Sequence, residues 1–201
     1  MEKENIGILL IGLPGHGKSS LGNFLLSKQI FKVSDGYKLC TRNISSYTSG
    51  NLTIIDTPGF DSVENDKVFI NEIKEYINKS KNIRAILIVI NSQEVRITND
   101  FKNLIKMICN NFKYDILYHI AFVFSKSSFM NYKQKQIMLE SKKYFISETN
   151  KLIESFYGKS FNPEGFHSFF IDSDLENTKD ENSVERNYII EWAKSLLYIK
   201  N

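Results

Sequence analysis

The chain has 201 residues, of which 42% are hydrophobic, and it carries a formal net charge of +3. This composition is typical of one globular domain with a sizeable core, so we expect a single domain over residues 1–201. Basic residues outnumber acidic ones only by 26 to 23 and are scattered. That balance indicates a solvated surface, and we expect no nucleic-acid partner.

The cysteines and the apolar runs indicate a cellular location. Cys40 and Cys109 form no C-x-x-C pair, which is typical of a reducing compartment. No apolar run reaches the roughly 18 residues that a membrane-spanning helix needs. Because a strand is predicted almost at the start of the chain, we expect no secretory signal. The sequence therefore predicts a soluble, cytoplasmic protein.

The first motif is a phosphate-binding loop. The apolar run Ile6–Ile11 is followed by G-x-x-x-x-G-K-S over Gly12–Ser19 and then by a helical pattern, which is the strand–loop–helix context that this motif requires. Glycines let backbone N–H groups turn toward phosphate oxygens, and the positive end of the helix points the same way. A glycine-rich turn with an exposed lysine is the alternative. We assign the phosphate contacts to Gly12, Gly15, His16, Gly17, Lys18, Ser19 and Ser20.

Two of these side chains have specific roles in such a loop. Lys18 places a positive charge on the β- and γ-phosphates, and the Ser19 hydroxyl is placed to ligate Mg²⁺. Residues 31–50 have no periodicity and contain turn signals, so we expect a mobile switch loop that ends in a short hairpin. Thr41 is our candidate to reach Mg²⁺ when this loop closes, with Thr48 and Ser45 as alternatives.

The second motif is D-T-P-G over Asp56–Gly59, at the end of the β-branched strand Leu52–Asp56. Asp56 is expected to hold the metal, commonly through water, and Gly59 to offer its N–H to the γ-phosphate. A simple turn is the alternative for this tetrapeptide. Phe60 stands where Ras-type proteins have the glutamine that orients the attacking water. We therefore expect slow intrinsic hydrolysis, or completion of the site by another group.

The remaining pattern predicts the fold. Apolar runs at 83–90 and 116–124 are expected as buried strands, and 66–80 and 98–112 as amphipathic helices. A long helical region over 131–158, a short strand over 168–172 and a helix over 184–199 complete the chain, with Tyr188, Ile189, Trp192, Leu196 and Leu197 packing on the sheet. This alternation predicts a doubly wound, mostly parallel α/β sheet flanked by helices, as in P-loop nucleotide-binding domains.

The loop Ser125–Ser128 occupies the place of the N/T-K-x-D base-binding motif of GTPases. Lys126 is kept, and its stem can lie on the base, but Ser128 replaces the aspartate that pairs with guanine. Asp172 or Asp174 could supply the carboxylate; both could equally be solvated turn residues. The departure weakens the case for guanine but not for a nucleoside triphosphate.

The stretches GKSSLGNFLLSKQIF, DTPGFDS and VRITNDF resemble those of the avirulence-induced and immunity-associated GTPases (the GIMAP group), relatives of plastid import receptor GTPases and septins. The similarity spans Ile6–Asp174. Its most specific element is Arg96–Asp100, which resembles the box of this family, with Ile97 in place of the usual aromatic residue. The resemblance implies an AIG-type GTPase domain with bound GTP or GDP and Mg²⁺. It also implies a homodimer through the nucleotide face and peripheral membrane association in some members.

The leading hypothesis is a GTP-hydrolysing switch that acts by nucleotide-dependent dimerisation. The resemblance suggests that Arg96 contacts the phosphates of the partner subunit; the alternative is an arginine that pairs with Asp100. A P-loop ATPase or small-molecule kinase is a second class, although the four arginines of the chain are few for the clamp that kinases use. A scaffold that binds nucleotide with negligible turnover is a third.

Overall fold

The computed structural model describes residues 4–33, 41, 43–60, 66–80, 82–94, 96–127, 132–161, 165–171 and 180–199. Within them the chain forms a six-stranded sheet with the order β2-β3-β1-β4-β5-β6. All neighbouring strands are parallel except β2 and β3. The strands are β1 (Ile6–Ile11), β2 (Ser45–Ser49), β3 (Leu52–Asp56), β4 (Ile83–Asn91), β5 (Ile120–Ser125) and β6 (His167–Phe170).

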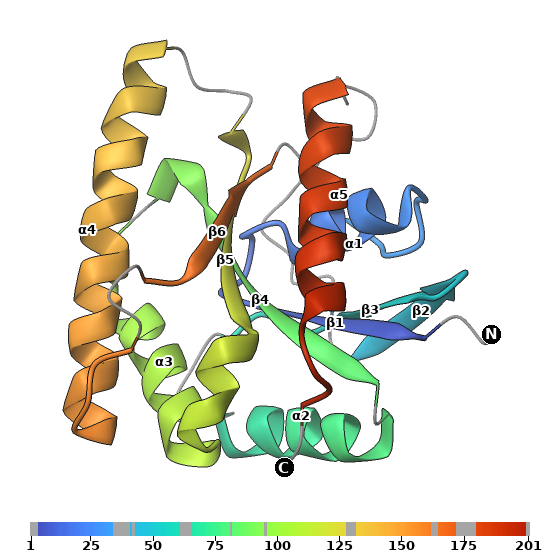
Figure 1. The fold of residues 1–201 in the computed structure, drawn as a ribbon, viewed down its shortest axis with the longest axis horizontal. Helices are drawn as coiled ribbons and strands as arrows, with labels where there is room; N and C mark the ends of the chain where they lie inside the picture. The colour runs from blue at the N-terminus through green and yellow to red at the C-terminus, as the bar shows by residue number, and fades with distance from the viewer. Residues whose placement is uncertain are drawn as a thin grey trace.

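Helices cover both faces of this sheet (Figure 1). One core cluster joins α1 (Lys18–Leu26) and α5 (Asp180–Ser195) to the sheet. The other joins α2 (Asp66–Ser80), α3 (Asn99–Asn111) and α4 (Tyr132–Tyr157) to the opposite face. Every residue of β1, β4 and β5 is buried, because strands that are covered on both faces must be apolar on both. The predicted doubly wound α/β fold is confirmed.

Most of the predicted elements are present with small shifts at their ends. The hairpin expected at the end of residues 31–50 is formed by β2 and the predicted strand β3, with Thr48 opposite Thr53. Helix α3 begins directly after Thr98, whose hydroxyl accepts a hydrogen bond from the Phe101 N–H at 3.1 Å. This N-cap fixes the start of the helix where the sequence predicts it.

Two predictions of local structure are wrong. The strand expected over 116–124 begins only at Ile120, because Tyr114–His119 form a 3₁₀ helix that buries Ile116 and Leu117. In the last helix Ile189 is buried, but Tyr188 is 62% exposed, and Leu197, beyond the end of α5, is 81% exposed. Trp192 and Leu196 pack against the core cluster as expected, so apolar character misidentified Tyr188 and Leu197 only.

The strand order reverses its direction beside β1, which lies between β3 and β4. Open α/β sheets bind ligands outside the carboxyl ends of their strands at such a switch point. The loop that follows β1, the end of β3 and the end of β4 therefore meet at one edge. No helix among the described residues is long and apolar enough to cross a membrane.

Candidate nucleotide-binding site

The loop after β1 is held against β4 by glycine backbone. Gly12 has φ 148°, and a Cβ built there would lie 2.5 Å from the Val89 carbonyl oxygen. Gly17, the residue before α1, has φ 88°. Side chains would be strained at both positions. The loop thus follows the path of a phosphate cradle, and its N–H groups lead directly into the first turn of α1.

Lys18 is buried at the centre of this loop. Its side chain is only 6% exposed and donates hydrogen bonds to the carbonyl oxygens of Gly12 at 3.2 Å and Leu13 at 3.0 Å. Burial lowers the pKa of Lys18 to about 8, and the nearby charge of Asp56 partly opposes that shift. A cation held in so dry a place is stabilised by any anion that enters the loop.

Three oxygen-bearing side chains from separate elements meet beside this lysine. The Ser19 hydroxyl, in the first turn of α1, donates to Asp56 Oδ2 at 2.7 Å. Thr41 Oγ1 lies 3.3 Å from the same oxygen and 3.2 Å from Ser19 Oγ. Of the three candidates from the switch region, Thr41 is the one whose hydroxyl bonds Asp56. Ser45 lies opposite Asp56 in the β2–β3 register, but its side chain makes no hydrogen bond to that carboxylate. Thr48 instead bonds Thr53, 2.8 Å away within the β2–β3 hairpin.

This cluster fits Mg²⁺. Asp56 is 1% exposed, and its Oδ1 atom has no hydrogen-bond partner among the described residues. Burial raises the pKa of Asp56, whereas the bond from Ser19 and the charge of Lys18 act in the opposite direction. An unpartnered buried carboxylate oxygen beside two hydroxyls is the oxygen-rich surrounding that Mg²⁺ prefers when phosphates supply further ligands. Ser19, Thr41 and Asp56 would hold the ion, which would neutralise charge on the phosphates.

The D-T-P-G loop closes over the phosphate cradle. A Cβ at Gly59 would lie 2.6 Å from Pro14 Cα, so the backbone of the two loops can touch only because residue 59 is glycine. Thr57 is fully buried and donates to the Leu10 carbonyl oxygen at 2.7 Å. The contact brings the peptide of Gly59 beside the loop that is expected to hold the phosphates.

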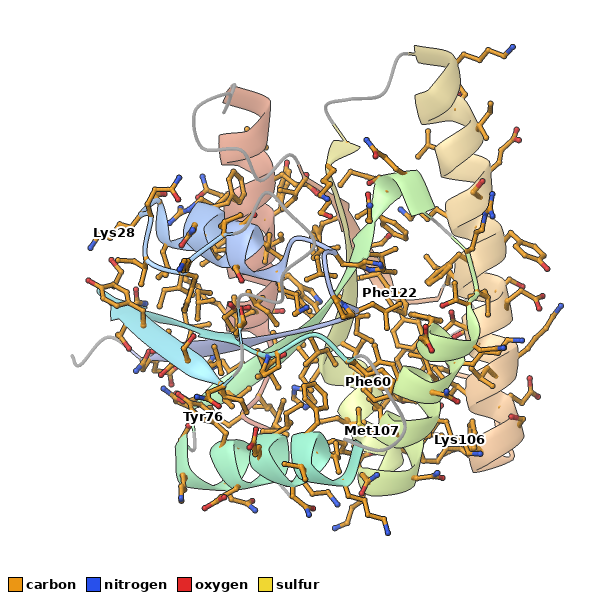
Figure 2. All side chains as sticks on the ribbon, turned by 180° about the vertical axis from the view of Figure 1, so that it is seen from behind. Lys28, Phe60, Tyr76, Lys106, Met107 and Phe122 are labelled. Carbon is orange, nitrogen blue, oxygen red and sulfur yellow. The ribbon has the colours of Figure 1, made fainter. Side chains whose placement is uncertain are left out.

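Phe60 belongs to the core. Its N–H donates to the Gly12 carbonyl oxygen at 3.1 Å, but its side chain is 3% exposed and meets the Phe69 ring edge-on with centroids 6.0 Å apart. Figure 2 shows Phe60 among the side chains between the sheet and helices α2 and α3. The residue therefore anchors the segment that leads into α2 and contributes no group that could orient water.

The loop after β5 is hydrogen-bonded to the phosphate loop. Lys126, with φ 57°, donates to the Gly15 carbonyl oxygen at 3.3 Å. The His16 backbone is part of the loop, whereas its ring Nδ1 lies 3.3 Å from the Val89 carbonyl oxygen of β4. Ser128, Asp172 and Asp174, which bear on the choice of base, lie outside the described residues.

One residue that holds the site together was missed by the sequence analysis. Ser125 is fully buried, and its hydroxyl donates to the His16 carbonyl oxygen at 2.7 Å. It lies 3.2 Å from the position that a Cβ on Gly17 would take. The sequence did contain a signal for this role. Ser125 begins S-K-S-S at the position where the base-binding motif has Asn or Thr, and those two residues can also form a hydrogen bond to a neighbouring loop.

Arg96 lies at the same edge of the sheet, two residues before the Thr98 cap of α3. Its side chain is exposed and makes no ion pair with Asp100 or any other described residue. The other described arginines are engaged elsewhere. Arg84 lies 4.2 Å from the Tyr198 ring centroid and donates to the Lys194 carbonyl oxygen, and Arg186 donates to the Leu25 carbonyl oxygen.

Comparison with known sequences identifies the family. A sequence model of the AIG1 family matches residues 6–159. Immune-associated nucleotide-binding protein 7 of Arabidopsis thaliana is 30% identical over 130 residues, which are 61% of this chain and 42% of that protein. The probable GTP-binding protein EngB of Wolbachia pipientis is 30% identical over 149 residues, 70% of this chain and 71% of its own. The chain thus spans about two fifths of the plant relative.

Solved structures share the fold. Toc33 from Arabidopsis thaliana, in complex with GDP and Mg²⁺, superposes with a TM-score of 0.71 at 17% identity, over 95% of this chain and 83% of its own. A second similar structure, of the chloroplast translocon components atToc33 and psToc159, has a TM-score of 0.68 at 19% identity, over 94% and 82%. The family match covers most of the chain, from the phosphate loop through the base loop and α4. The chain belongs to the AIG1 family.

Proposed function

We propose that the protein binds GTP with Mg²⁺ and hydrolyses it to GDP. The observation that carries this proposal is the meeting of Ser19, Thr41 and Asp56 beside the buried ammonium of Lys18. Phosphoryl transfer depends mainly on positioning and on charge stabilisation, and this group of residues offers both. The family, and the GTP-binding description of its relative EngB, support the choice of nucleotide.

Each residue has a role in this proposal. Lys18 and the N–H groups of the loop bind the phosphates, including those of Gly12, Gly15, His16, Gly17, Ser19 and Ser20. Thr41 and Gly59 close on the γ-phosphate from the two switch segments, and Thr41 and Asp56 hold the metal together with Ser19. Residues 1–201 act as one AIG-type GTPase domain.

Selectivity for guanine is expected to be weaker than in proteins with the full N/T-K-x-D loop. Lys126 supports the base with its stem, whereas Ser128 cannot replace the missing carboxylate. Asp172 or Asp174 remains the proposed substitute. A site that recognises a specific group by hydrogen bonds rejects analogues that lack this group by large factors. The ratio of GTP affinity to ATP affinity therefore measures how well another residue replaces the missing contact between a carboxylate and guanine.

Hydrolysis is completed, in this proposal, by a second copy of the chain. Phe60 is occupied in the core, and Arg96 is the one described arginine that is exposed at the nucleotide edge. In the chloroplast translocon components atToc33 and psToc159, dimerisation is important for the GTPase activity. We infer a homodimer through the nucleotide face in which Arg96 reaches the phosphates of the partner subunit. A cytoplasmic location remains a prediction from the cysteines and the apolar runs of the sequence, and peripheral membrane contact remains a prediction from the family resemblance.

A kinase of small molecules is a weaker candidate. Arg84 and Arg186 are bonded away from the phosphate loop, so they cannot join a clamp around a second phosphorylated substrate.

Phosphate release from GTP, with Mg²⁺ and a several-fold excess of nucleotide, tests the proposed function. We expect turnover with GTP, slower turnover with ATP, and none in Lys18→Ala, whose fold survives because the loop backbone needs no lysine. Asp172→Ala is the matched variant for base choice and should reduce the preference for GTP if Asp172 reads guanine. Equal turnover of wild type and Lys18→Ala would show that this site does not act on nucleotide.

A further inference from the structure

A groove of about 410 Å³ runs between α2 and α3, away from the phosphate loop. Its floor is formed by Ile70 and Met107, which are only 4% and 5% exposed. Figure 2 labels Met107 and Lys106 next to one another on α3. Because the floor side chains are nearly covered, an occupant would first meet the walls, whose polar atoms belong to lysines and asparagines.

The walls carry positive charge. Lys67 from α2 and Lys106 from α3 line the groove, and no described residue that lines it is acidic. The acidic residues of these two helices include Glu72, Glu75 and Asp100, none of which lines the groove. In a chain whose total charge is nearly balanced, a groove whose described lining has two cations and no acid favours an anionic occupant.

The walls are also unusually rich in amides. Four of the eight lining residues are asparagines, although only 20 of the 201 residues in the chain are asparagine. Asn111 is already engaged, since it accepts from Lys74 and donates to the Met107 carbonyl oxygen. The side-chain amides of Asn71, Asn103 and Asn110 make no hydrogen bond with another described residue. These three amides can each donate to and accept from an incoming chain.

The spacing of these amides suits an extended peptide. Asn103 and Asn110 are seven residues apart on α3, which places them about 10 Å apart along the helix axis. Three residues of extended chain cover about the same length. Backbone N–H and C=O groups of such a peptide match carboxamides, and its acidic side chains match the two lysines. A polyanion without peptide groups could accept from the lysines and from the amide N–H groups, but it would leave the carboxamide oxygens without a donor.

We propose that the α2–α3 groove binds an extended acidic segment of a partner protein. Lys67 and Lys106 pair its carboxylates, and Asn71, Asn103 and Asn110 bond its backbone. The groove is built from helix surfaces and needs no nucleotide to exist. Its test is therefore made on nucleotide-free protein, so that a failure of GTP binding and a failure of this proposal are distinguished.

The probe is a fluorescein-labelled dodecapeptide of alternating glutamate and serine, measured by polarisation at about 0.15 M ionic strength, where the Debye length is about 8 Å. We expect binding that falls at least about tenfold in Lys67→Glu/Lys106→Glu, because both attractions become repulsions. Lys143→Glu/Lys194→Glu reverses two exposed lysines on α4 and α5 and should change affinity by less than about twofold, since exposed charges outside the groove are screened. The same peptide with glutamine for glutamate should bind much more weakly.

Asn71→Ala/Asn110→Ala keeps both lysines and separates peptide recognition from simple charge attraction. We expect a loss of several-fold with this variant. The proposal is overturned if wild type does not bind the acidic peptide, or if the lysine pair and its control lose affinity equally. It is also overturned if the asparagine variant binds as wild type does, or if a single-stranded oligonucleotide binds more tightly with the same dependence on Lys67 and Lys106.

Discussion

At the scale of single residues, the site is built from charged groups that are buried, although burial disfavours their charged forms. Lys18 is buried among backbone carbonyls, and Asp56 is buried with one oxygen unpartnered among the described residues. Burial disfavours the charged form of each, and each only partly compensates the other. Such groups gain most when a metal and a polyphosphate arrive, since both charges then acquire partners.

The lowered pKa of Lys18 predicts that nucleotide affinity falls as pH rises. With a pKa of about 8 in the ligand-free protein, the amine is mostly neutral at pH 9 and must take up a proton to bind phosphate. We expect affinity for Mg²⁺·GDP to fall by up to about tenfold between pH 7 and 9. Calorimetry at pH 8.5 in buffers of different ionisation enthalpy should show proton uptake. Zero uptake together with a flat pH profile would contradict the buried, low-pKa lysine.

Phe60 illustrates that the position of a residue in a motif does not show where its side chain points. The motif locates the residue after Gly59, where a glutamine would act in Ras-type proteins, but the direction of the side chain depends on tertiary contacts. In the fold the aromatic ring finds Phe69 and the core, because burial of a large apolar side chain is worth about 1.5–3 kcal/mol. The residue at this position therefore cannot orient water, but its side chain helps to hold α2 against the core.

At the scale of elements, sequence patterns correctly predicted the features that depend on the local conformational preferences of the residues. The phosphate loop, the Asp56 strand and the Thr98 cap follow from glycine conformations, β-branched runs and N-cap preference. The 3₁₀ turn over Tyr114–His119 did not follow, since Ile116 and Leu117 are as apolar as strand residues and bury equally well. Periodicity cannot separate two short structures that both bury the same side chains.

For the site too, the sequence predicted the residues in local motifs but not the contacts between distant segments. Thr41 could be named among three candidates, but only the path of the chain brings it to Asp56. The bond from Ser125 to the His16 carbonyl oxygen joins residues 109 positions apart, and no local pattern encodes such a contact. Long-range pairing therefore accounts for most of what the sequence did not reveal.

The cap of α3 gives a prediction at this scale. Thr98→Ala removes the acceptor of the Phe101 N–H and should lower the free energy of unfolding by about 1 kcal/mol. Thr98→Ser keeps the hydroxyl and serves as the control. Urea denaturation of the three proteins measures the difference. If alanine and serine proved equally stable, the hydroxyl would not act as a cap, and the start of α3 would have to be fixed by its packing.

At the scale of the whole molecule, the proposed dimer would place a second copy across the nucleotide edge of the sheet. Arg96 is exposed there without an ion pair to the described residues, whereas Arg84 is bonded to chain segments near both ends of the protein. A dimer across this edge would bury the phosphates and add a cation to each site. Exclusion of water strengthens that interaction.

The dimer predicts activity that depends on protein concentration. Specific GTPase activity should rise with concentration, and Arg96→Ala should flatten that rise while GTP affinity stays within about twofold, since arginine fingers supply roughly 10³–10⁵ in rate where they operate. Lys102→Ala removes an exposed cation from α3, the helix that follows Arg96, as a control. Activity that is independent of concentration would count against the dimer, as would an Arg96→Ala protein as active as wild type. Neither result would affect the assignment of GTP binding.

The most direct test of the central claim is equilibrium binding of a fluorescent GTP analogue with Mg²⁺ and with EDTA, to wild type and to Asp56→Asn. The claim is that Ser19, Thr41 and Asp56 form the metal half of a GTP site. We predict that removal of Mg²⁺ weakens wild-type binding at least about tenfold. Asp56→Asn keeps the shape but not the charge, and its affinity should change little between the two conditions. Wild-type binding that is equally tight with and without Mg²⁺, or no binding of GTP in either, would contradict the account.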